Sequence, residues 1–99
     1  MLIITGTFRL PPANLHAARQ AMAAMVAASR VEAGCLHYSY GEDVFDPGLI
    51  HVTEHWADHA TLAAHGTSPH IRAWRAAWPG LGIGDRDLTL FEADGGRPA

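Results

Sequence analysis

The chain has 99 residues, a formal net charge of −3 with its histidines neutral, and a single cysteine. This length fits one domain, the weakly acidic charge without a basic stripe argues against nucleic-acid binding, and the lone cysteine excludes a disulfide framework and favours a reducing compartment, the cytoplasm. The N-terminal run lacks a basic segment and is too short for a bilayer, so we expect neither a signal peptide nor a membrane span.

The first third of the chain predicts a strand followed by an amphipathic helix. Residues 2–10 are rich in Ile, Thr and Phe and stop at a Pro-Pro pair, which is typical of a strand. Asn14 is a suitable N-cap for the helix that follows, and Gly34 ends this unit. One face of the helix is apolar at three- and four-residue steps and consists of Leu15, Ala18, Met22, Met25, Val26 and Ser29.

The middle of the chain predicts two strands joined by a turn. Aromatic side chains alternate in residues 35–43, and residues 49–56 are rich in β-branched side chains. The Asp-Pro-Gly sequence at 46–48 is a turn signal, because Pro presets φ and Gly permits the chain to reverse.

Two short helices follow. Asp58 and Ser68 are both good N-caps, and Pro after Ser68 suits a first helical position. We therefore expect helices at 59–65 and 69–78, the second of them ended by the Pro-Gly pair at 79–80.

Residues 87–93 predict the last strand. The element order is then β-α-β-β-α-α-β, which is the α+β ferredoxin-like split βαβ arrangement with an antiparallel sheet and a divided second helix. We assign residues 1–93 to this domain and residues 94–99 to a flexible C-terminal tail.

His51, Glu54 and His55 match H-x-x-E-H, a zinc signature that requires a helix. This stretch is short, rich in β-branched residues and follows a Pro-Gly turn, so it predicts a strand instead. Four residues of strand span about 13 Å, which is too far for two imidazoles that each bind one zinc ion at about 2 Å. We therefore predict no zinc site here.

Strand alternation places one carboxylate among apolar side chains. Glu54 shares its face with Val52 and Trp56, and a buried charge is costly unless it is paired or neutralised. His65 is the candidate partner, because the first short helix must fold back over this face. The two would form an acid–base pair beside an aromatic pocket. In the structural alternative, Glu54 only accepts backbone hydrogen bonds and His65 caps its own helix.

Three more side chains belong to the predicted pocket. Tyr38 and Tyr40 are suited to donate hydroxyl hydrogen bonds to a substrate. His70 lies in the first turn of a helix, where a positive charge is unfavourable. We therefore expect His70 to be a neutral, hydrogen-bonded ring rather than a catalyst.

The sequence predicts no cofactor. It has no G-x-G-x-x-G phosphate loop, no G-x-S-x-G nucleophile motif and no convincing ligand cluster, so we expect no metal, flavin or haem. The second face of the sheet carries Thr, Phe and His rather than the Lys and Glu of a solvated face. That composition predicts a homodimer formed through this face.

Two motifs carry a resemblance to a known family. The pattern Glu-x-Gly-Cys-x-x-Tyr falls on Glu32, Gly34, Cys35 and Tyr38. The pattern Glu-x-Trp…Ala-x-x-Ala-His-x-x-x-Pro-His falls on Glu54, Trp56, Ala60, Ala63, His65, Pro69 and His70. With the outer strands, residues 2–92 resemble the antibiotic biosynthesis monooxygenase (ABM) family, ferredoxin-like proteins that pair through their sheets as a dimeric α+β barrel.

The resemblance implies cofactor-independent oxidation of a small aromatic substrate by O₂, with quinols, phenols and polyketide-like aromatics as the substrate class. Such a reaction needs a base, donors for the developing anion and a dry pocket. The resemblance then assigns proton handling to the catalytic pair Glu54 and His65, and substrate binding to Tyr38, Tyr40, Trp56, Trp74 and His70.

Other branches of the family remain as alternatives. The haem-degrading branch fits poorly, because the first strand lacks the Asn that this branch uses and Arg75 stands near the position of its catalytic His. An isomerase of the same fold and a non-catalytic dimeric protein that binds a small ligand both stay open, since one fold serves many functions.

Overall fold

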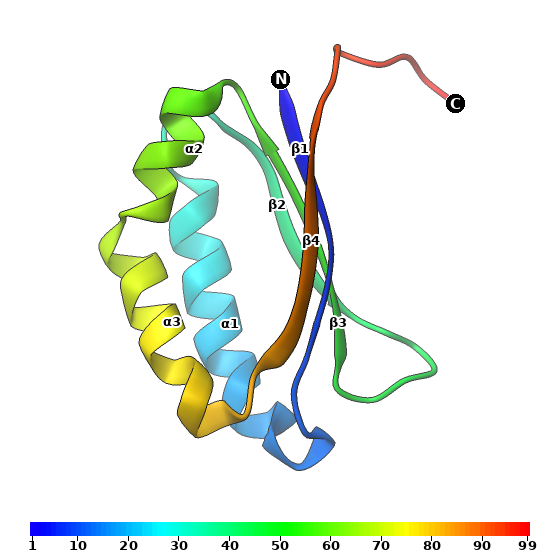
Figure 1. The fold of residues 1–99 in the computed structure, drawn as a ribbon, viewed down its shortest axis with the longest axis vertical. Helices are drawn as coiled ribbons and strands as arrows, with labels where there is room; N and C mark the ends of the chain where they lie inside the picture. Colours follow the sequence, from blue (N-terminus) through cyan, green and yellow to red (C-terminus); the bar gives the residue numbers. More distant parts are fainter.

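The computed structural model describes residues 1–99 as three helices packed on one face of a four-stranded antiparallel sheet (Figure 1). The elements in chain order are β1 (Leu2–Arg9), a 3₁₀ turn η1 (Pro12–Asn14), α1 (Leu15–Arg30), β2 (Cys35–Glu42), β3 (Leu49–Trp56), α2 (His59–Gly66), α3 (Pro69–Leu81) and β4 (Gly84–Glu92). The strand order is β2-β3-β1-β4. The predicted ferredoxin-like arrangement is confirmed.

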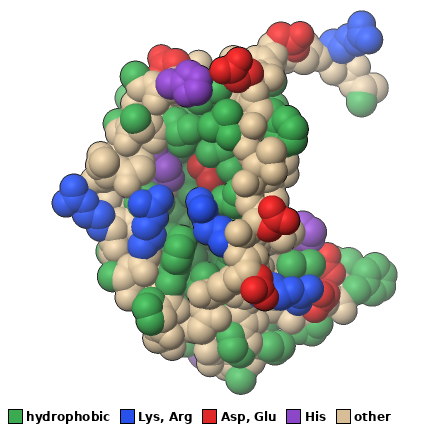
Figure 2. Space-filling view, viewed as in Figure 1, with side chains coloured by type: hydrophobic (Ala, Val, Ile, Leu, Met, Phe, Trp, Pro, Cys, Tyr) green, Lys and Arg blue, Asp and Glu red, His purple; other side chains and the backbone are tan.

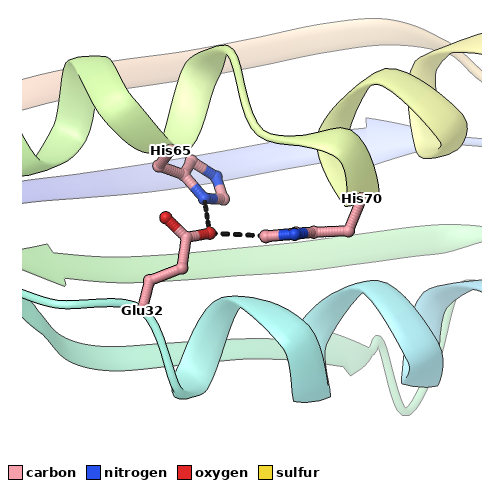
Figure 3. A group of neighbouring side chains, drawn as sticks. All are labelled: Glu32, His65 and His70. Carbon is pink, nitrogen blue, oxygen red and sulfur yellow. Dashed lines mark hydrogen bonds and ion pairs between the residues drawn. The ribbon is translucent and has the colours of Figure 1, made fainter.

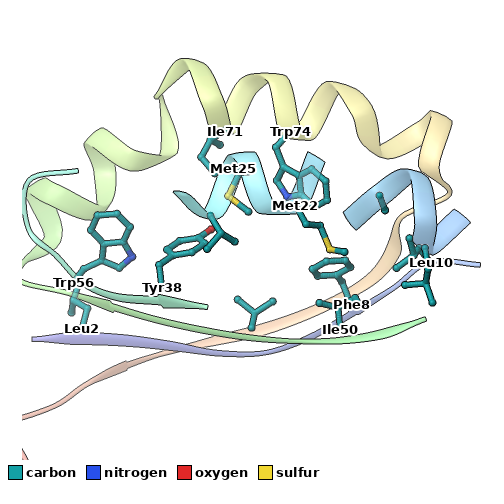
Figure 4. Close-up of a cluster of buried hydrophobic side chains, with 14 residues drawn as sticks. Leu2, Phe8, Leu10, Met22, Met25, Tyr38, Ile50, Trp56, Ile71 and Trp74 are labelled. Atoms are coloured by element: carbon teal, nitrogen blue, oxygen red, sulfur yellow. The ribbon is translucent and has the colours of Figure 1, made fainter. Parts of the chain in front are cut away.

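The core lies between the helices and the sheet (Figure 4). The face of α1 predicted to be apolar is the face that is buried. Opposite it, β3 presents Ile50, Val52 and Trp56, which are exposed by no more than 1% of their surface. These side chains alternate with exposed or half-buried ones along β3, so the period-two pattern of the sequence predicted the covered face correctly.

The strand interpretation of the H-x-x-E-H stretch is also confirmed. His51 and His55 lie on the uncovered face of β3, opposite the side that carries Glu54. His51 binds the Asp43 carboxylate across the hairpin at 2.8 Å. The histidine rings of His37 and His55 lie 5.1 Å apart on the same uncovered face. This face has no helical layer in Figure 1.

Three local predictions were wrong. Asn14 precedes α1 but makes no side-chain cap; its amide donates to the Leu81 carbonyl instead. Helix α3 does not stop at Pro79 but continues to Leu81 and ends at Gly82 in the left-handed conformation. A proline is tolerated there because it removes only one hydrogen bond close to the helix end. Strand β4 begins at Gly84, three residues before the predicted start.

A bulge in β2 changes which side chains face the helices. Cys35 is opposite Trp56 and His37 is opposite His55, so Leu36 is the extra residue. Strict alternation with Tyr38 would place Leu36 on the covered face, but Leu36 is exposed. Cys35 packs against the core in its place. After the bulge the register is regular, and Tyr38 lies opposite Glu54 on the covered face.

No helix of the chain combines the length and the apolar composition needed to cross a bilayer. Residues 93–99 form no regular secondary structure, and both the domain boundary at residue 93 and the flexibility of the tail stay predictions.

Candidate active site

A cavity of about 100 Å³ lies between the sheet and helices α2 and α3. Aromatic and aliphatic side chains form most of its wall. Figure 2 shows the face where it opens, with basic side chains around a hollow and acidic and histidine side chains deeper inside. The polar residues of its lining are Tyr38, Tyr40, Glu54, His65, Arg75 and Arg86.

Glu54 is the buried carboxylate of this cavity. It stands on β3 and only 5% of its surface is exposed. The Trp56 indole N–H donates to its Oε1 atom at 3.0 Å. Burial raises the pKa of Glu54, whereas the Trp56 hydrogen bond and the charges of His65 and Arg86 act in the opposite direction. The environment therefore favours the neutral carboxyl group compared with water.

His65, the penultimate residue of α2, faces Glu54 and is equally buried, with 5% of its surface exposed. The Nε2 atom of His65 lies 3.9 Å from Oε1 of Glu54. This separation is too long for a direct hydrogen bond. The ring is held among aromatic neighbours, 4.6 Å from Trp56 and 5.3 Å from Tyr38 between centroids. The structure thus brings the predicted pair together and leaves a gap between them.

The other nitrogen of His65 is fixed by Glu32 (Figure 3). Nδ1 of His65 lies 2.7 Å from Oε1 of Glu32, and Nε2 of His70 makes a hydrogen bond to the same oxygen. An ionised carboxylate can only accept, so the nitrogens that face it carry protons. In a neutral His65 ring, Nε2 is then the unprotonated nitrogen, and it faces Glu54.

Two turns place these groups. Glu32 lies in the turn between α1 and β2, and Gly34 follows with φ at +79°. A Cβ atom at Gly34 would lie 2.3 Å from Cγ2 of Thr61, in the first turn of α2. Thr61 itself forms a capping box with Asp58. The missing side chain at Gly34 therefore lets α2 approach the turn that carries Glu32.

The Glu32, His65 and His70 group could also offer three ligand atoms to a metal, since these atoms lie within 4.8 Å of one another. The sequence had suggested no such cluster. Two ligands of a tetrahedral zinc ion with bonds of about 2 Å lie roughly 3.3 Å apart, but His65 and Glu32 are 2.7 Å apart. The present spacing is that of hydrogen bonds, so a metal would have to separate the side chains. The independence from metals stays a prediction.

The predicted substrate-binding residues fall into two groups. Tyr38, Tyr40 and Trp74 line the cavity, whereas Trp56 and His70 do not. Trp56 is fully buried and holds Glu54, and His70 lies on the far side of His65 at Glu32. Burial raises the pKa of both tyrosines, which keeps their hydroxyls protonated and able to donate.

Sequence reasoning missed Glu32, Trp78 and Arg86 as residues of the site. Glu32 had been noted only as part of a motif. Arg86 has the same parity as Leu88 on β4, so it points to the covered face, but it lay outside the predicted strand. Its guanidinium is 5.9 Å from the Trp78 ring centroid.

A larger hollow of about 340 Å³ lies between α1 and the edge of β2. Its charged residues already have partners: Arg19 pairs with Glu42 of the same lining, and Arg30 donates to the Tyr38 carbonyl. No buried carboxylate or histidine reaches it. The smaller cavity is therefore the better candidate for chemistry.

Comparisons with known proteins agree with the fold. The sequence model of the family described as antibiotic biosynthesis monooxygenase matches residues 1–77. A crystal structure of a candidate antibiotic biosynthesis monooxygenase from Deinococcus radiodurans is 29% identical, with 100% of this chain and 98% of that chain covered and a TM-score of 0.92.

Two further structures are similar. A Pseudomonas aeruginosa protein is 29% identical over 91% of this chain and 88% of its own, with a TM-score of 0.77. A Mycobacterium tuberculosis protein is 25% identical over 99% of this chain and 98% of its own, with a TM-score of 0.78. No protein of curated function matches the chain.

Proposed function

The chain belongs to the antibiotic biosynthesis monooxygenase family, and from this premise we propose that it oxidises an electron-rich aromatic substrate with O₂ and without a cofactor. The family and its structural neighbours support a general monooxygenase-like role. The substrate class, a quinol, phenol or polyketide-like aromatic, and the roles of the side chains are our proposal.

The observation that carries it is the gap of 3.9 Å between His65 and Glu54. Both groups are buried in an aromatic cavity and neither satisfies the other. A substrate hydroxyl between them would donate to the unprotonated Nε2 of His65 and accept from a neutral Glu54. Glu32 holds the opposite nitrogen of His65, as the orienting carboxylate does in other histidine-based sites.

Proton transfer to His65 starts the reaction. The substrate anion that results is a stronger electron donor than the neutral phenol, and donors such as Tyr38 and Tyr40 stabilise its charge. One electron passes from the anion to O₂, and the substrate radical and superoxide combine as a peroxide. Loss of water then converts an R₂CH₂ carbon and O₂ into R₂C=O and H₂O. The proton taken by His65 returns to the peroxide oxygen.

The test is oxygen uptake by purified protein with a panel of quinols and anthrones. Turnover that is faster than the uncatalysed reaction, falls in the His65→Ala variant and persists in chelator supports the proposal. The His16→Ala variant, altered at an exposed site on α1, is the matched control. Uptake at the uncatalysed rate for the whole panel, or turnover that stops in chelator, contradicts it.

One observation favours a second candidate, a protein that binds a small ligand without turnover. The cavity of about 100 Å³ is smaller than ordinary small-molecule sites, which range over roughly 300–1,000 Å³. Binding of an aromatic probe by a protein that consumes no oxygen with any substrate of the panel would favour this function.

We also propose that the protein acts as a homodimer in the cytoplasm. The uncovered face of the sheet carries Thr, His and Phe side chains, among them Phe91 with 51% of its surface exposed. Such a face needs a partner. Light scattering at micromolar concentration should give twice the chain mass of 10.6 kDa, and a monomer mass would contradict the dimer. The chain's single cysteine, Cys35, has no partner for an intrachain disulfide, which suits a reducing compartment.

A further inference from the structure

We propose that the ligand of this cavity is an aromatic carboxylate, whose ring enters beside Trp74 and Trp78 and whose carboxylate is bound by Arg75 and Arg86 at the mouth. This inference narrows the substrate class and rests on the proposed function in its choice of cavity. The lining has more hydrogen-bond donors and positive charges than it has acceptors and negative charges.

The two arginines carry positive charges without an ionic partner. What sets Arg75 and Arg86 apart is that both unpaired guanidinium groups line one cavity. Arg9 and Arg19 both form two-pronged pairs with carboxylates on the surface. Arg75, by contrast, donates only to the Gly66 carbonyl at 3.3 Å. Arg86 makes no hydrogen bond or ion pair and lies over Trp78.

Two buried N–H groups of the same lining also have no acceptor. They are the Nε1 atoms of Trp74 and Trp78, and Trp74 is more than nine-tenths buried. The Trp74 indole lies near the Tyr40 hydroxyl and partly offsets the rise that burial causes in the Tyr40 pKa. The Trp74 N–H nevertheless makes no hydrogen bond to Tyr40. Buried donors are nearly always satisfied in folded proteins, so these two indicate a missing acceptor.

The lining supplies no anionic acceptor for these donors. Its single carboxylate is Glu54, which already accepts from Trp56 and whose burial favours the neutral form. The ligand must therefore bring oxygen acceptors and a negative charge. A carboxylate fits two guanidinium groups, since their planar forks match its oxygens.

The other lining residues are mostly aromatic, which favours a ligand whose carboxylate is attached to an aromatic ring. Phe8, Tyr40 and Trp74 lie within 6.2 Å of one another between centroids, in edge-on or tilted orientations. A further ring can continue that arrangement. The present cavity of about 100 Å³ is smaller than the 150 Å³ cavity that accepts benzene. Entry of fused rings thus requires the exposed Arg86 and half-buried Trp78 side chains to move.

The experiment measures binding rather than turnover. A hydroxynaphthoate that reports by fluorescence, its methyl ester and the parent naphthol are titrated into the protein at low and high salt. We expect the acid to bind at least tenfold more tightly than the ester, with this preference reduced at high salt. Arg75→Gln and Arg86→Gln should each weaken binding of the acid by about tenfold and leave the ester unchanged.

Arg72→Gln is the matched control, because Arg72 is exposed on the same helix as Arg75 but does not line the cavity. Equal affinity for acid and ester, or equal loss in all three variants, would overturn the proposal, as would no binding of the acid to folded wild-type protein. Specific binding of the acid without oxygen uptake by any substrate would contradict the proposed function and leave this inference standing.

Discussion

The two carboxylates on either side of His65 are in opposite situations. Glu32 binds Nδ1 of His65 and Nε2 of His70 with a single oxygen. Glu54 faces Nε2 of His65 across 3.9 Å and binds only Trp56. The Nδ1 side of the imidazole, which we call the closed side, is therefore occupied by a hydrogen bond. The Nε2 side, which we call the open side, has room for a third group between His65 and Glu54. This asymmetry distinguishes a site built to receive a ligand from a histidine that is merely buried among acceptors.

The strongest test of this asymmetry removes the imidazole. In His65→Ala, turnover should fall by roughly 10²–10⁴-fold, the range for loss of a general acid–base group, while circular dichroism shows a retained fold. If both sides of His65 are only structural, the main effect is instead a loss of about 1–3 kcal/mol in the free energy of unfolding. Oxygen uptake and chemical denaturation measured on one preparation separate the two.

Replacing the closed side should have the next largest effect. In Glu32→Gln the new amide can donate to Nδ1 of His65 and so favour the tautomer with its proton on Nε2. Turnover should fall by about 10²-fold, less than the ~10⁴-fold seen when an orienting carboxylate becomes an amide in a Ser-His-Asp site. Imidazole nitrogen shifts in NMR should show the proton on Nδ1 in wild type. Wild-type His65 protonated on Nε2 alone would contradict the assignment.

The open side should be visible in the pH dependence of stability. Burial raises the pKa of Glu54 in the folded state above its value in the unfolded chain. The folded state thus holds this proton more tightly, and the resulting stabilisation is complete below the usual carboxyl pKa and lost as pH rises through the folded-state pKa. Relative to Glu54→Gln, wild type should lose stability between acidic and neutral pH. A difference that is constant with pH would contradict the raised pKa.

The smallest effect is expected at His70. His70→Asn removes one of the two hydrogen bonds to Glu32 but leaves His65 in place. The free energy of unfolding should fall by about 0.5–1.5 kcal/mol, and turnover should change by less than about threefold because the ring does not line the cavity. A loss of turnover comparable to that of His65→Ala would contradict this prediction and show that His70 takes part in catalysis.

The sequence allowed Glu54 to be located but not Glu32, for a physical reason. The side of Glu54 follows from the period of a strand, which is a local property. The contact of Glu32 with His65 joins residues 33 positions apart and depends on how a turn and a helix end are packed. Periodicity holds no information about such a contact.

The same limit explains the other differences. Arg86 was missed because the start of β4 was placed three residues late, so its side of the sheet could not be assigned. The bulge at Leu36 reversed one position of β2, and no turn residue marks it. Helix α3 passes Pro79 because Gly82 terminates it instead. Caps at Asp58 and Ser68, which depend on near neighbours alone, were predicted correctly.

The position of Gly34 against Thr61 has a consequence for local unfolding. Helix α2 has eight residues, too few to be stable in isolation, so its attachment depends on the contact at Gly34, its capping box and the bond from His65 to Glu32. Opening of this one helix would separate His65 from both carboxylates while the sheet stayed intact. We therefore expect the amide protons of α2 to exchange with solvent sooner than those of β1. A ligand that binds only the closed form should slow this exchange, because its binding free energy adds to the free energy needed to open α2.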